Sequence, residues 1–427
     1  MYVKQIYVKR GVRMKKKIFA LAIALIMIAI VTLVGCDFAS DGKDSGDSGK
    51  KPTTSSASAK NITVTVKEVQ PSDPTEEEPT DIKSVLKRVE KTIVKVNYKT
   101  EKTTLTASGI IIGSGVTKLT DDEVSAGVTP EKTSYILTSL DFIEKSIAAD
   151  KLDAADNPGT SGKNPVSITT YDGKTYPALF VGGDPDSDVC VLYAVAELPA
   201  CTVYNGKAET GESVIAGGNP LSAVPGVTFT SGIVSAVCEN FETEQGKITF
   251  LQTDAYVKSG SAGGGLFTRA GYLVGLITER YNKFLNKGTD GIGIVVPSDI
   301  AIDVSKKLMG TFTQEGSSGY IPGKFMLGYS VKDYSNNVFG TQGYVYFDWL
   351  DETGSLYKCG IVAGDKIISV RKGETGEEYK VTRASGFKAY IESLDLKIGD
   401  RLVINIERNT TKLAVTVTVL QYVYGRL

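Results

Sequence analysis

The stretch from Gln252 to Thr278 contains the residues of this chain whose types and spacing best suit catalysis. It begins with Gln-Thr-Asp-Ala, continues through a turn from Gly260 to Gly265 that reads G-S-A-G-G-G, and ends in an apolar run at 273–277 that predicts a strand. A glycine-rich turn can present backbone N–H groups to the negative charge that develops on a carbonyl oxygen during acyl transfer. The pattern therefore indicates a nucleophile loop between two strands.

Histidine is absent from all 427 residues. An imidazole is the most common general base, a common metal ligand and the side chain that titrates near neutral pH, so none of these roles is open to histidine in this chain. The net charge of −1 gives no sign of nucleic-acid binding. We therefore expect no nucleic-acid partner, no metal and no other cofactor.

The loop resembles that of the HtrA/Deg family of trypsin-like serine proteases with a C-terminal PDZ domain, in which it reads T-D-A-x-x-N-P-G-N-S-G-G-P-L. The matching residues are Thr253, Asp254, Ala255, Gly260, Gly263, Gly264 and Leu266. The position of the family's attacking serine holds Ala262 instead. The resemblance implies that the backbone N–H groups of Gly260 and Ala262 correspond to the oxyanion hole.

Two further segments resemble the sequences around the other members of the family's catalytic triad. Residues 135–143 read YILTSLDFI and are similar to Y-I-L-T-N-N-H-V-I, so the position of the catalytic histidine holds Asp141. The segment at 184–189 resembles the sequence around the catalytic aspartate, which is retained as Asp188. The resemblance implies two facing carboxylates, so we expect one raised pKa and either a shared proton or an associated cation or Lys side chain.

Serine-protease catalysis needs an attacking oxygen, a base and a carboxylate that orients the base. Loss of the nucleophile or the base alone costs on the order of a millionfold in turnover. Ser261 is next to the nucleophile position, but a neighbouring residue in a tight turn directs its side chain elsewhere. Ser259 with Lys258 is a Ser/Lys pair by composition only. The interpretation is therefore a pseudoprotease, and the alternative is an active HtrA-type serine endopeptidase.

Short strand patterns separated by Gly, Asp and Asn turns recur from residue 92 to residue 296 and predict an all-β barrel or sandwich. Helical spacing predicts one helix at 81–89, with Asp81 as its N-cap, and another at 298–308. The resemblance extends along this region and implies a trypsin-like double β-barrel at 80–312. Two stretches, at about 115–133 and 144–164, have the character of insertions.

After a linker at 313–321, residues 322–422 resemble a PDZ domain, which has an α+β fold. Residues 354–368 are similar to the family's S-P-A-A-x-A-G-L-x-x-G-D-x-I. The resemblance places the carboxylate-binding loop and the start of the binding strand at Met326, Leu327, Gly328 and Tyr329. It implies the binding of extended peptides or protein C-termini by strand addition, with Leu327 and Tyr329 lining the groove.

The N-terminal region resembles a bacterial lipoprotein signal. A basic Met-Lys-Lys-Lys sequence precedes the apolar run at 18–34, which ends in L-V-G-C at Cys36. We expect a signal peptide at 1–35, lipidation of Cys36, and a tether at 36–79 that is rich in polar residues apart from an alternating stretch at 61–69. The alternative is a plain transmembrane anchor.

Together these features predict an HtrA-like pseudoprotease anchored at the extracytoplasmic face of a bacterial cell membrane. We expect it to bind peptides or protein C-termini as a scaffold or chaperone-like factor in envelope protein quality control. The resemblance also implies a homotrimer, although no residue of the sequence fixes the oligomeric state. Four cysteines without metal spacing are expected as free thiols, with a Cys190–Cys201 disulfide as the alternative; the four are Cys190, Cys201, Cys238 and Cys359.

Overall fold

The computed structural model describes residues 62–69, 81–100, 102–117, 125–127, 129–156, 165–219, 226–243, 246–257, 260–283, 291–312, 318–336 and 341–424. The predicted signal peptide, Cys36 and most of the predicted tether lie outside these residues, as does the Ser259–Lys258 pair. Within the described part of the chain, no helix combines the length and apolar character needed to cross a bilayer.

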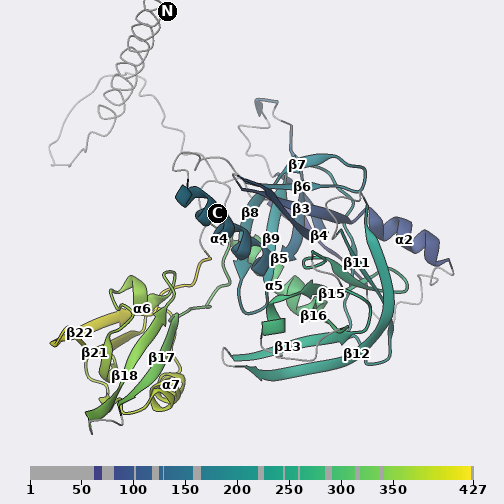
Figure 1. Ribbon diagram of the computed structural model, residues 1–427. Helices are drawn as coiled ribbons and strands as arrows, with labels where there is room; N and C mark the ends of the chain where they lie inside the picture. The colour runs from purple at the N-terminus through teal and green to yellow at the C-terminus, as the bar shows by residue number, and fades with distance from the viewer. Residues whose placement is uncertain are drawn as a thin grey trace, which may run out of the picture. The chain divides into compact units, whose positions relative to one another are not determined.

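The first β-sheet has the strand order β7-β6-β3-β4-β5-β9-β8, with β1 paired to β4 (Figure 1). Ala178, just before β8, donates its N–H to the carbonyl of Val166 at 3.1 Å, which brings the two ends of the sheet together. Its strands are β1 (Ile62–Thr65), β3 (Ile93–Lys99), β4 (Thr104–Thr117), β5 (Lys132–Ser139), β6 (Val166–Thr169), β7 (Thr175–Pro177), β8 (Leu179–Asp184) and β9 (Val189–Ala194).

The second β-sheet has the order β14-β11-β12-β13-β16-β15-β10-β2. Pairing between β14 and β15 closes six of these strands into a ring, so this sheet is a barrel. Its strands are β2 (Lys67–Val69), β10 (Thr202–Tyr204), β11 (Ser213–Gly218), β12 (Thr228–Thr243), β13 (Gly246–Thr253), β14 (Gly265–Thr268), β15 (Leu273–Thr278) and β16 (Gly293–Pro297). The fold is the trypsin-like double β-barrel expected from the sequence.

Among the described residues, the helices beside the barrels are α2 (Ile82–Glu90), α4 (Leu140–Asp156), the 3₁₀ helix η1 (Arg280–Lys283) and α5 (Ser298–Thr311). The predicted N-cap of α2 is confirmed, because the carboxylate of Asp81 accepts the N–H of Lys83 at 3.1 Å. The helix α4 was not predicted. It begins directly after β5 and includes part of the stretch that the sequence indicated as an insertion.

A hydrophobic core joins the two barrels. Ile110 and Tyr135 enter it from the first sheet, Phe250 and Phe267 from the second, and Leu308 from α5. Each of these side chains is 2% exposed or less, so the position of one barrel against the other is fixed by apolar packing. Separate buried clusters fill the interior of each barrel.

The segment at 62–69 connects both sheets. Its first half, β1, pairs antiparallel with β4, and its second half, β2, pairs in parallel with β10. Glu68 also forms an ion pair with Lys306 of α5. The alternating stretch is therefore not an isolated strand, because it contributes one strand to each sheet.

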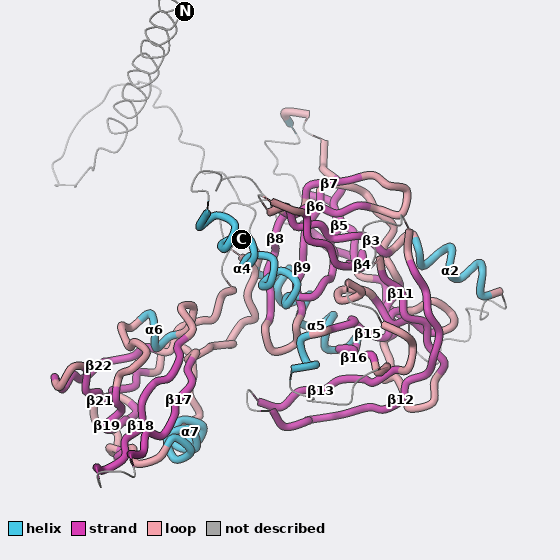
Figure 2. The backbone as a smooth tube through the Cα atoms, viewed as in Figure 1, coloured by secondary structure: helices cyan, strands magenta, loops and turns pink. Residues whose placement is uncertain are grey.

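The C-terminal region contains a third sheet of order β17-β18-β19-β21-β22, with β20 paired to β19 (Figure 2). Its elements are β17 (Tyr329–Asn336), β18 (Thr341–Leu350), α6 (Ser355–Lys358), β19 (Lys366–Lys372), β20 (Tyr379–Lys380), α7 (Ala384–Ser393), β21 (Arg401–Arg408) and β22 (Thr411–Thr418). The strand β17 forms one edge of this sheet, and α7 packs beside it through Phe387 and Tyr329, whose rings are 5.5 Å apart.

The four cysteines are free thiols in the structure, as the sequence predicted. Cys190 and Cys201 are buried in the apolar clusters of the barrels. Cys238 and Cys359 are partly exposed.

Candidate functional site

The loop from Gly260 to Gly265 lies between β13 and β14 and contacts the first barrel. Ser108 of β4 donates its N–H to the carbonyl of Ala262 and its hydroxyl to the carbonyl of Gly260, both at 3.0 Å. Gly263 has a φ of 83°, and a Cβ built on it would lie 2.1 Å from the carbonyl oxygen of Ser108. Only glycine fits there, so these contacts hold position 262 at the junction of the two barrels.

Position 262 is 7% exposed and carries only a methyl group. A methyl group has no lone pair that could attack a carbonyl carbon. In the described part of the loop, the N–H groups of Gly263 and Gly264 bond to the carbonyls of Ile277 and Ser261, whereas those of Gly260 and Ala262 donate no hydrogen bond. The two amides that the resemblance assigned to an oxyanion hole thus have no acceptor among the described residues.

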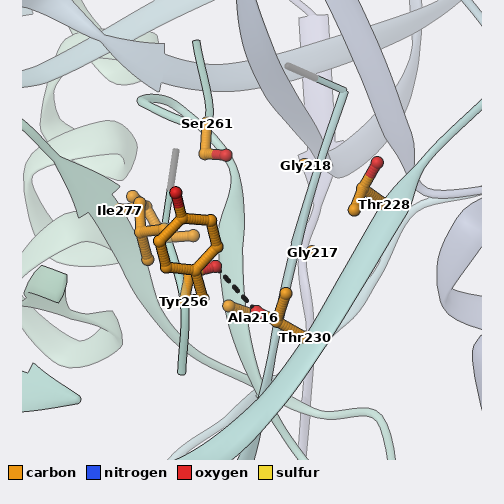
Figure 3. A pocket seen from close by; sticks show the side chains of 9 residues that line it. Ala216, Gly217, Gly218, Thr228, Thr230, Tyr256, Ser261 and Ile277 are labelled. Carbon is orange, nitrogen blue, oxygen red and sulfur yellow. Dashed lines mark hydrogen bonds between the residues drawn. The ribbon is translucent and has the colours of Figure 1, made fainter. Parts of the chain in front are cut away.

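A small pocket adjoins this loop, and the side chain of Ser261 forms part of its wall (Figure 3). Ser261 is 8% exposed. Ser261 thus lines the pocket, whereas the carbonyls of its two neighbours, Gly260 and Ala262, accept hydrogen bonds from Ser108. The remaining lining residues are Ala216, Gly217, Gly218, Thr228, Thr230, Tyr256, Val257 and Ile277.

Asp188 is fully buried between the two barrels, with a φ of 56°. Its carboxylate accepts hydrogen bonds from the hydroxyls of Ser139 at 2.7 Å and Thr278 at 2.6 Å, and from the N–H of Asp141 at 2.7 Å. Burial raises the pKa of Asp188 to about 6, against the opposing effect of these three hydrogen bonds and of Arg280. The retained aspartate is thus held by hydrogen bonds that involve no imidazole.

Asp141 lies in the first turn of α4, and its carboxylate forms an ion pair with Lys145 one turn later. The group of Asp141 that contacts Asp188 is its backbone N–H. The expectation was one raised pKa with a shared proton or an associated cation or Lys side chain, and the structure has a raised pKa at Asp188 and Lys145 beside Asp141. The raised pKa of Asp188 has burial as its largest cause.

Arg280 adds a second charged contact across the junction of the barrels. Its guanidinium lies 2.7 Å from the carboxylate of Glu144 in α4 and 4.0 Å from that of Asp188. The side chain of Arg280 is 15% exposed, so solvent screens this pair only partly. Arg280 follows β15 of the second barrel, and Glu144 belongs to the helix after β5, so the pair links the two barrels.

The chemistry open to this arrangement is limited. The described residues near position 262 offer amide donors and a buried carboxylate, but no attacking oxygen at the position of the nucleophile and no imidazole. No group of three or more acidic or cysteine side chains in the described ranges is arranged to hold a metal ion. The described residues therefore supply no nucleophile at position 262.

The loop before β17 has the second set of residues that the sequence singled out. The carbonyls of Met326, Leu327 and Gly328 accept N–H groups from the segment at 351–356, at 2.9, 3.2 and 3.0 Å respectively. Gly328 has a φ of 70°, and a Cβ on it would lie 2.8 Å from the Cβ of Asp351. All three carbonyls thus face the segment at 351–356, and the chain then enters the edge strand.

Two side chains of this loop differ in their surroundings. Leu327, which the sequence placed in the lining of the groove, is 8% exposed and packs in the apolar core of the third sheet. Tyr329 packs against Phe387 of α7, and burial raises its pKa to about 12. The aromatic ring of Tyr329 therefore lies between the edge strand and the helix.

Comparison with known proteins identifies the first two barrels. Residues 107–276 match the family described as "Trypsin-like peptidase domain". This part of the chain resembles a trypsin-like peptidase domain. The match spans β4 to β15 and so includes the positions of Asp141, Asp188 and Ala262.

Individual relatives of the peptidase domain are serine proteases. The chain is 28% identical over 256 residues to "Serine endoprotease DegS" of Haemophilus influenzae, which covers 59% of this chain and 66% of the relative. It is 28% identical over 263 residues to "Serine protease Do-like HtrA" of Lactobacillus helveticus, with 58% of this chain and 60% of the relative covered. The chain thus spans less than two thirds of the length of these relatives. A solved serine endoprotease from Yersinia pestis aligns with 81% of this chain and 99% of its own, at 23% identity and a TM-score of 0.43.

Several residues around the peptidase site were not found from the sequence. Ser139 and Thr278 hold Asp188, and Arg280 and Lys145 balance the carboxylates near it. One signal could have indicated Arg280, because a charged residue two positions after a fully buried strand is a candidate for a buried ion pair.

Proposed function

We propose that this protein is a catalytically inactive member of the HtrA/Deg family that binds extended peptides without cleaving them. The observation that carries the proposal is Ala262, a methyl group on a loop whose backbone is otherwise held in place. The loop keeps its contacts with Ser108, and the amides of Gly260 and Ala262 remain open to an external carbonyl. Binding needs this backbone frame, whereas cleavage needs a nucleophile and a base.

The charges near the site also favour inactivity. The carboxylate of Asp188 accepts three hydrogen bonds and faces Arg280, and with Asp141 at the histidine position there is no imidazole for it to orient. Asp141 is paired with Lys145. The histidine position therefore carries an acceptor that is neutralised by a lysine, and it supplies no base in place of the imidazole.

The C-terminal sheet has an edge that suits a second peptide-binding site. We infer that it is a PDZ domain, in which an extended peptide adds a strand to the edge strand β17 beside α7. The carbonyls of Met326 to Gly328 support this assignment, because they bond to the segment at 351–356 and so leave the N–H side of the loop for a terminal carboxylate. A protein with both sites would hold unfolded or exposed chain segments.

Its place in the cell is part of the same proposal. The lipoprotein-like sequence that ends at Cys36 would anchor the protein at the extracytoplasmic face of a bacterial membrane, with the tether separating it from the bilayer. The function would then be scaffolding or chaperone-like holding of envelope proteins.

The proposal is tested by measuring binding and cleavage on one sample. Purified full-length protein is incubated with fluorescent unfolded casein, binding is followed by fluorescence anisotropy, and the casein is then examined by mass spectrometry. We expect binding with intact casein. Fragments produced by the native protein, in amounts that follow its concentration through purification, would establish the alternative of an active endopeptidase.

A further inference from the structure

The second barrel has a pocket that is lined by β12, β13 and β15, by the start of α5 and by the chain between β10 and β11. About 250 Å³ of this pocket is open to the centre of a water molecule. A dry apolar cavity of about 150 Å³ is enough to hold a benzene ring. The pocket shares no lining residue with the small pocket beside the loop of Ala262. It therefore has room for a ring-sized molecule at a place that neither proposed peptide-binding site uses.

The floor of this pocket is apolar. Leu251 of β13 and Val274 of β15 line it, and both are buried in the cluster that fills the interior of the second barrel. Ala208 lines the pocket beside them and belongs to the same cluster. The part of a ligand that reaches these side chains leaves water for apolar surroundings, so an apolar group is favoured there.

An irregularity in the β12–β13 ladder brings polar groups to the pocket. Cys238 pairs with Phe250 and Phe241 pairs with Ile248, so Glu239 and Asn240 together oppose the single residue Thr249. Asn240 has a φ of 54°, and its N–H donates to the hydroxyl of Thr249 at 3.1 Å. A bulge of this kind redirects side chains and is common beside functional sites. Here both bulged residues line the pocket, and one of them is a carboxylate.

The charged side chains among the lining residues are Lys207, Glu239 and Asp299. The ammonium of Lys207 lies 2.9 Å from the carboxylate of Glu239, and both side chains are largely exposed, so this pair exchanges partners at little cost. Glu239 raises the pKa of Lys207 through its hydrogen bond and its charge, and Asp299 adds to the rise. Two carboxylates therefore stand against one ammonium, which favours a cationic ligand and disfavours an anion.

We propose that this pocket binds a small organic cation, namely an amine with a ring-sized apolar body. The apolar body packs against Leu251 and Val274, and the ammonium lies between Glu239 and Asp299, where it competes with Lys207 for the carboxylate of Glu239. The ligand is independent of the proposed function, because binding at this pocket requires no peptide and no residue of the loops at 260–265 and 326–328.

Three probes of one shape test the charge of the ligand on the full-length protein. They are 4-fluorobenzylamine, the uncharged 4-fluorobenzyl alcohol and the anionic 4-fluorobenzoate, and their binding is followed by ¹⁹F NMR line broadening at neutral pH. We expect a Kd on the order of 1 mM for the amine, since so small a ligand makes few contacts. The alcohol should bind about fivefold or more weakly than the amine, and the benzoate more weakly still.

Two matched pairs of variants test the location. Val237 lines the pocket and is 37% exposed, whereas Ile233 of the same strand is 40% exposed and does not line it. Val237→Trp should fill the pocket and weaken amine binding about tenfold or more, and Ile233→Trp should leave it unchanged. Asp299→Asn should weaken binding of the amine about threefold without affecting the alcohol, and Asp303→Asn on the same helix should affect neither.

Two results would overturn the proposal. Equal amine affinity in Val237→Trp and Ile233→Trp would show that the amine binds elsewhere. Equal affinity of the native protein for the amine and the alcohol, or tighter binding of the benzoate, would show that the pocket does not select a cation. Both substituted positions in the first pair are partly exposed, so both variants are expected to fold, and thermal denaturation checks this.

Discussion

Thr278 of the second barrel donates its hydroxyl to the carboxylate of Asp188 in the first barrel at 2.6 Å. Ser139 donates to the same carboxylate oxygen at 2.7 Å, and Arg280 faces the other oxygen from the second barrel. Asp188 therefore connects the barrels through polar contacts within an otherwise apolar junction. In the absence of an imidazole, this aspartate has a structural role that can be measured as stability.

The first prediction is that stability rises as the pH falls below about 6. Burial raises the folded-state pKa of Asp188 to about 6, whereas the pKa of an unfolded aspartate is near its ordinary value of 3.8. The folded protein therefore binds the proton more tightly between these values, so the free energy of unfolding increases as the pH falls through 6 and levels off near 3.8. The size of this component is on the order of 2 to 3 kcal/mol.

Asp188→Asn should remove the part of the unfolding free energy that depends on the titration of Asp188. Asparagine tolerates the positive φ of this position and needs no proton to be neutral. We expect the difference in unfolding free energy between the variant and the native protein to change with pH between about 6 and 4, as measured by urea denaturation. The exposed carboxylate variant Asp303→Asn is the control. A parallel pH dependence for Asp188→Asn and the native protein would contradict the assignment.

The second prediction concerns the hydroxyl of Thr278. Thr278→Val keeps the shape of the side chain and removes one donor to a buried carboxylate, which should lower the free energy of unfolding by about 1 to 3 kcal/mol. Thermal and urea denaturation measure this change. Thr106→Val, on a partly exposed position of β4, should have an effect within about 0.5 kcal/mol of zero. Equal effects at the two positions would show that Thr278 does not stabilise Asp188.

The third prediction concerns the loop before β17. A peptide with a free C-terminal carboxylate should bind more tightly than the same peptide with an amidated C-terminus, because only the carboxylate accepts charge-assisted hydrogen bonds from the loop. Gly328→Ala should weaken binding of the free acid, since its Cβ would lie 2.8 Å from Asp351. The control Gly373→Ala has a similar φ of 68° but no atom within 4 Å of its Cβ.

Fluorescence anisotropy with labelled peptides measures both effects. The carboxylate preference should persist in Gly373→Ala and fall in Gly328→Ala. Equal affinity of the native protein for the free-acid peptide and the amidated peptide would show that this loop does not bind a terminal carboxylate.

The strands of the barrels could be predicted because their signal is local. Alternation of apolar residues between turns predicts strands from residue 92 to residue 296, and β3 to β15 lie in this range. Strands as short as β10 and β14, with three and four residues, give only a weak periodic pattern of their own. The helix α4 was missed because it corresponds to a segment that the family resemblance treats as an insertion.

The site was predicted only as far as the motifs extend. The positions of Asp141, Asp188 and Ala262 follow from segments that resemble the family. The pair of Arg280 and Glu144 joins residues 136 positions apart in the sequence, and no local pattern encodes it. The same reasoning applies to the Lys side chain beside the two carboxylates, since Lys145 lies in a helix that the sequence did not predict.

The fourth prediction concerns the membrane anchor. If Cys36 carries the lipid, Cys36→Ser should move the protein into the soluble fraction or leave an uncleaved precursor, because lipidation is what holds the mature chain at the membrane. Cell fractionation followed by mass spectrometry of the N-terminus distinguishes these forms. A native protein that stays in the membrane with a cleaved N-terminus and no lipid mass would contradict the anchor. Cys238→Ser, which changes a cysteine within the barrels, should leave the location unchanged.

The central claim is that catalysis is absent because two positions of the triad have changed, and labelling with a fluorophosphonate tests it most directly. The native protein, the single variants Ala262→Ser and Asp141→His, and the double variant that combines them are incubated with the probe. An active serine protease is the positive control, and labelling is read by mass spectrometry. The account predicts no labelled serine in the native protein or in either single variant. It predicts labelling at position 262 in the double variant, in which serine, histidine and Asp188 form a triad. Labelling of a serine in the native protein would contradict it.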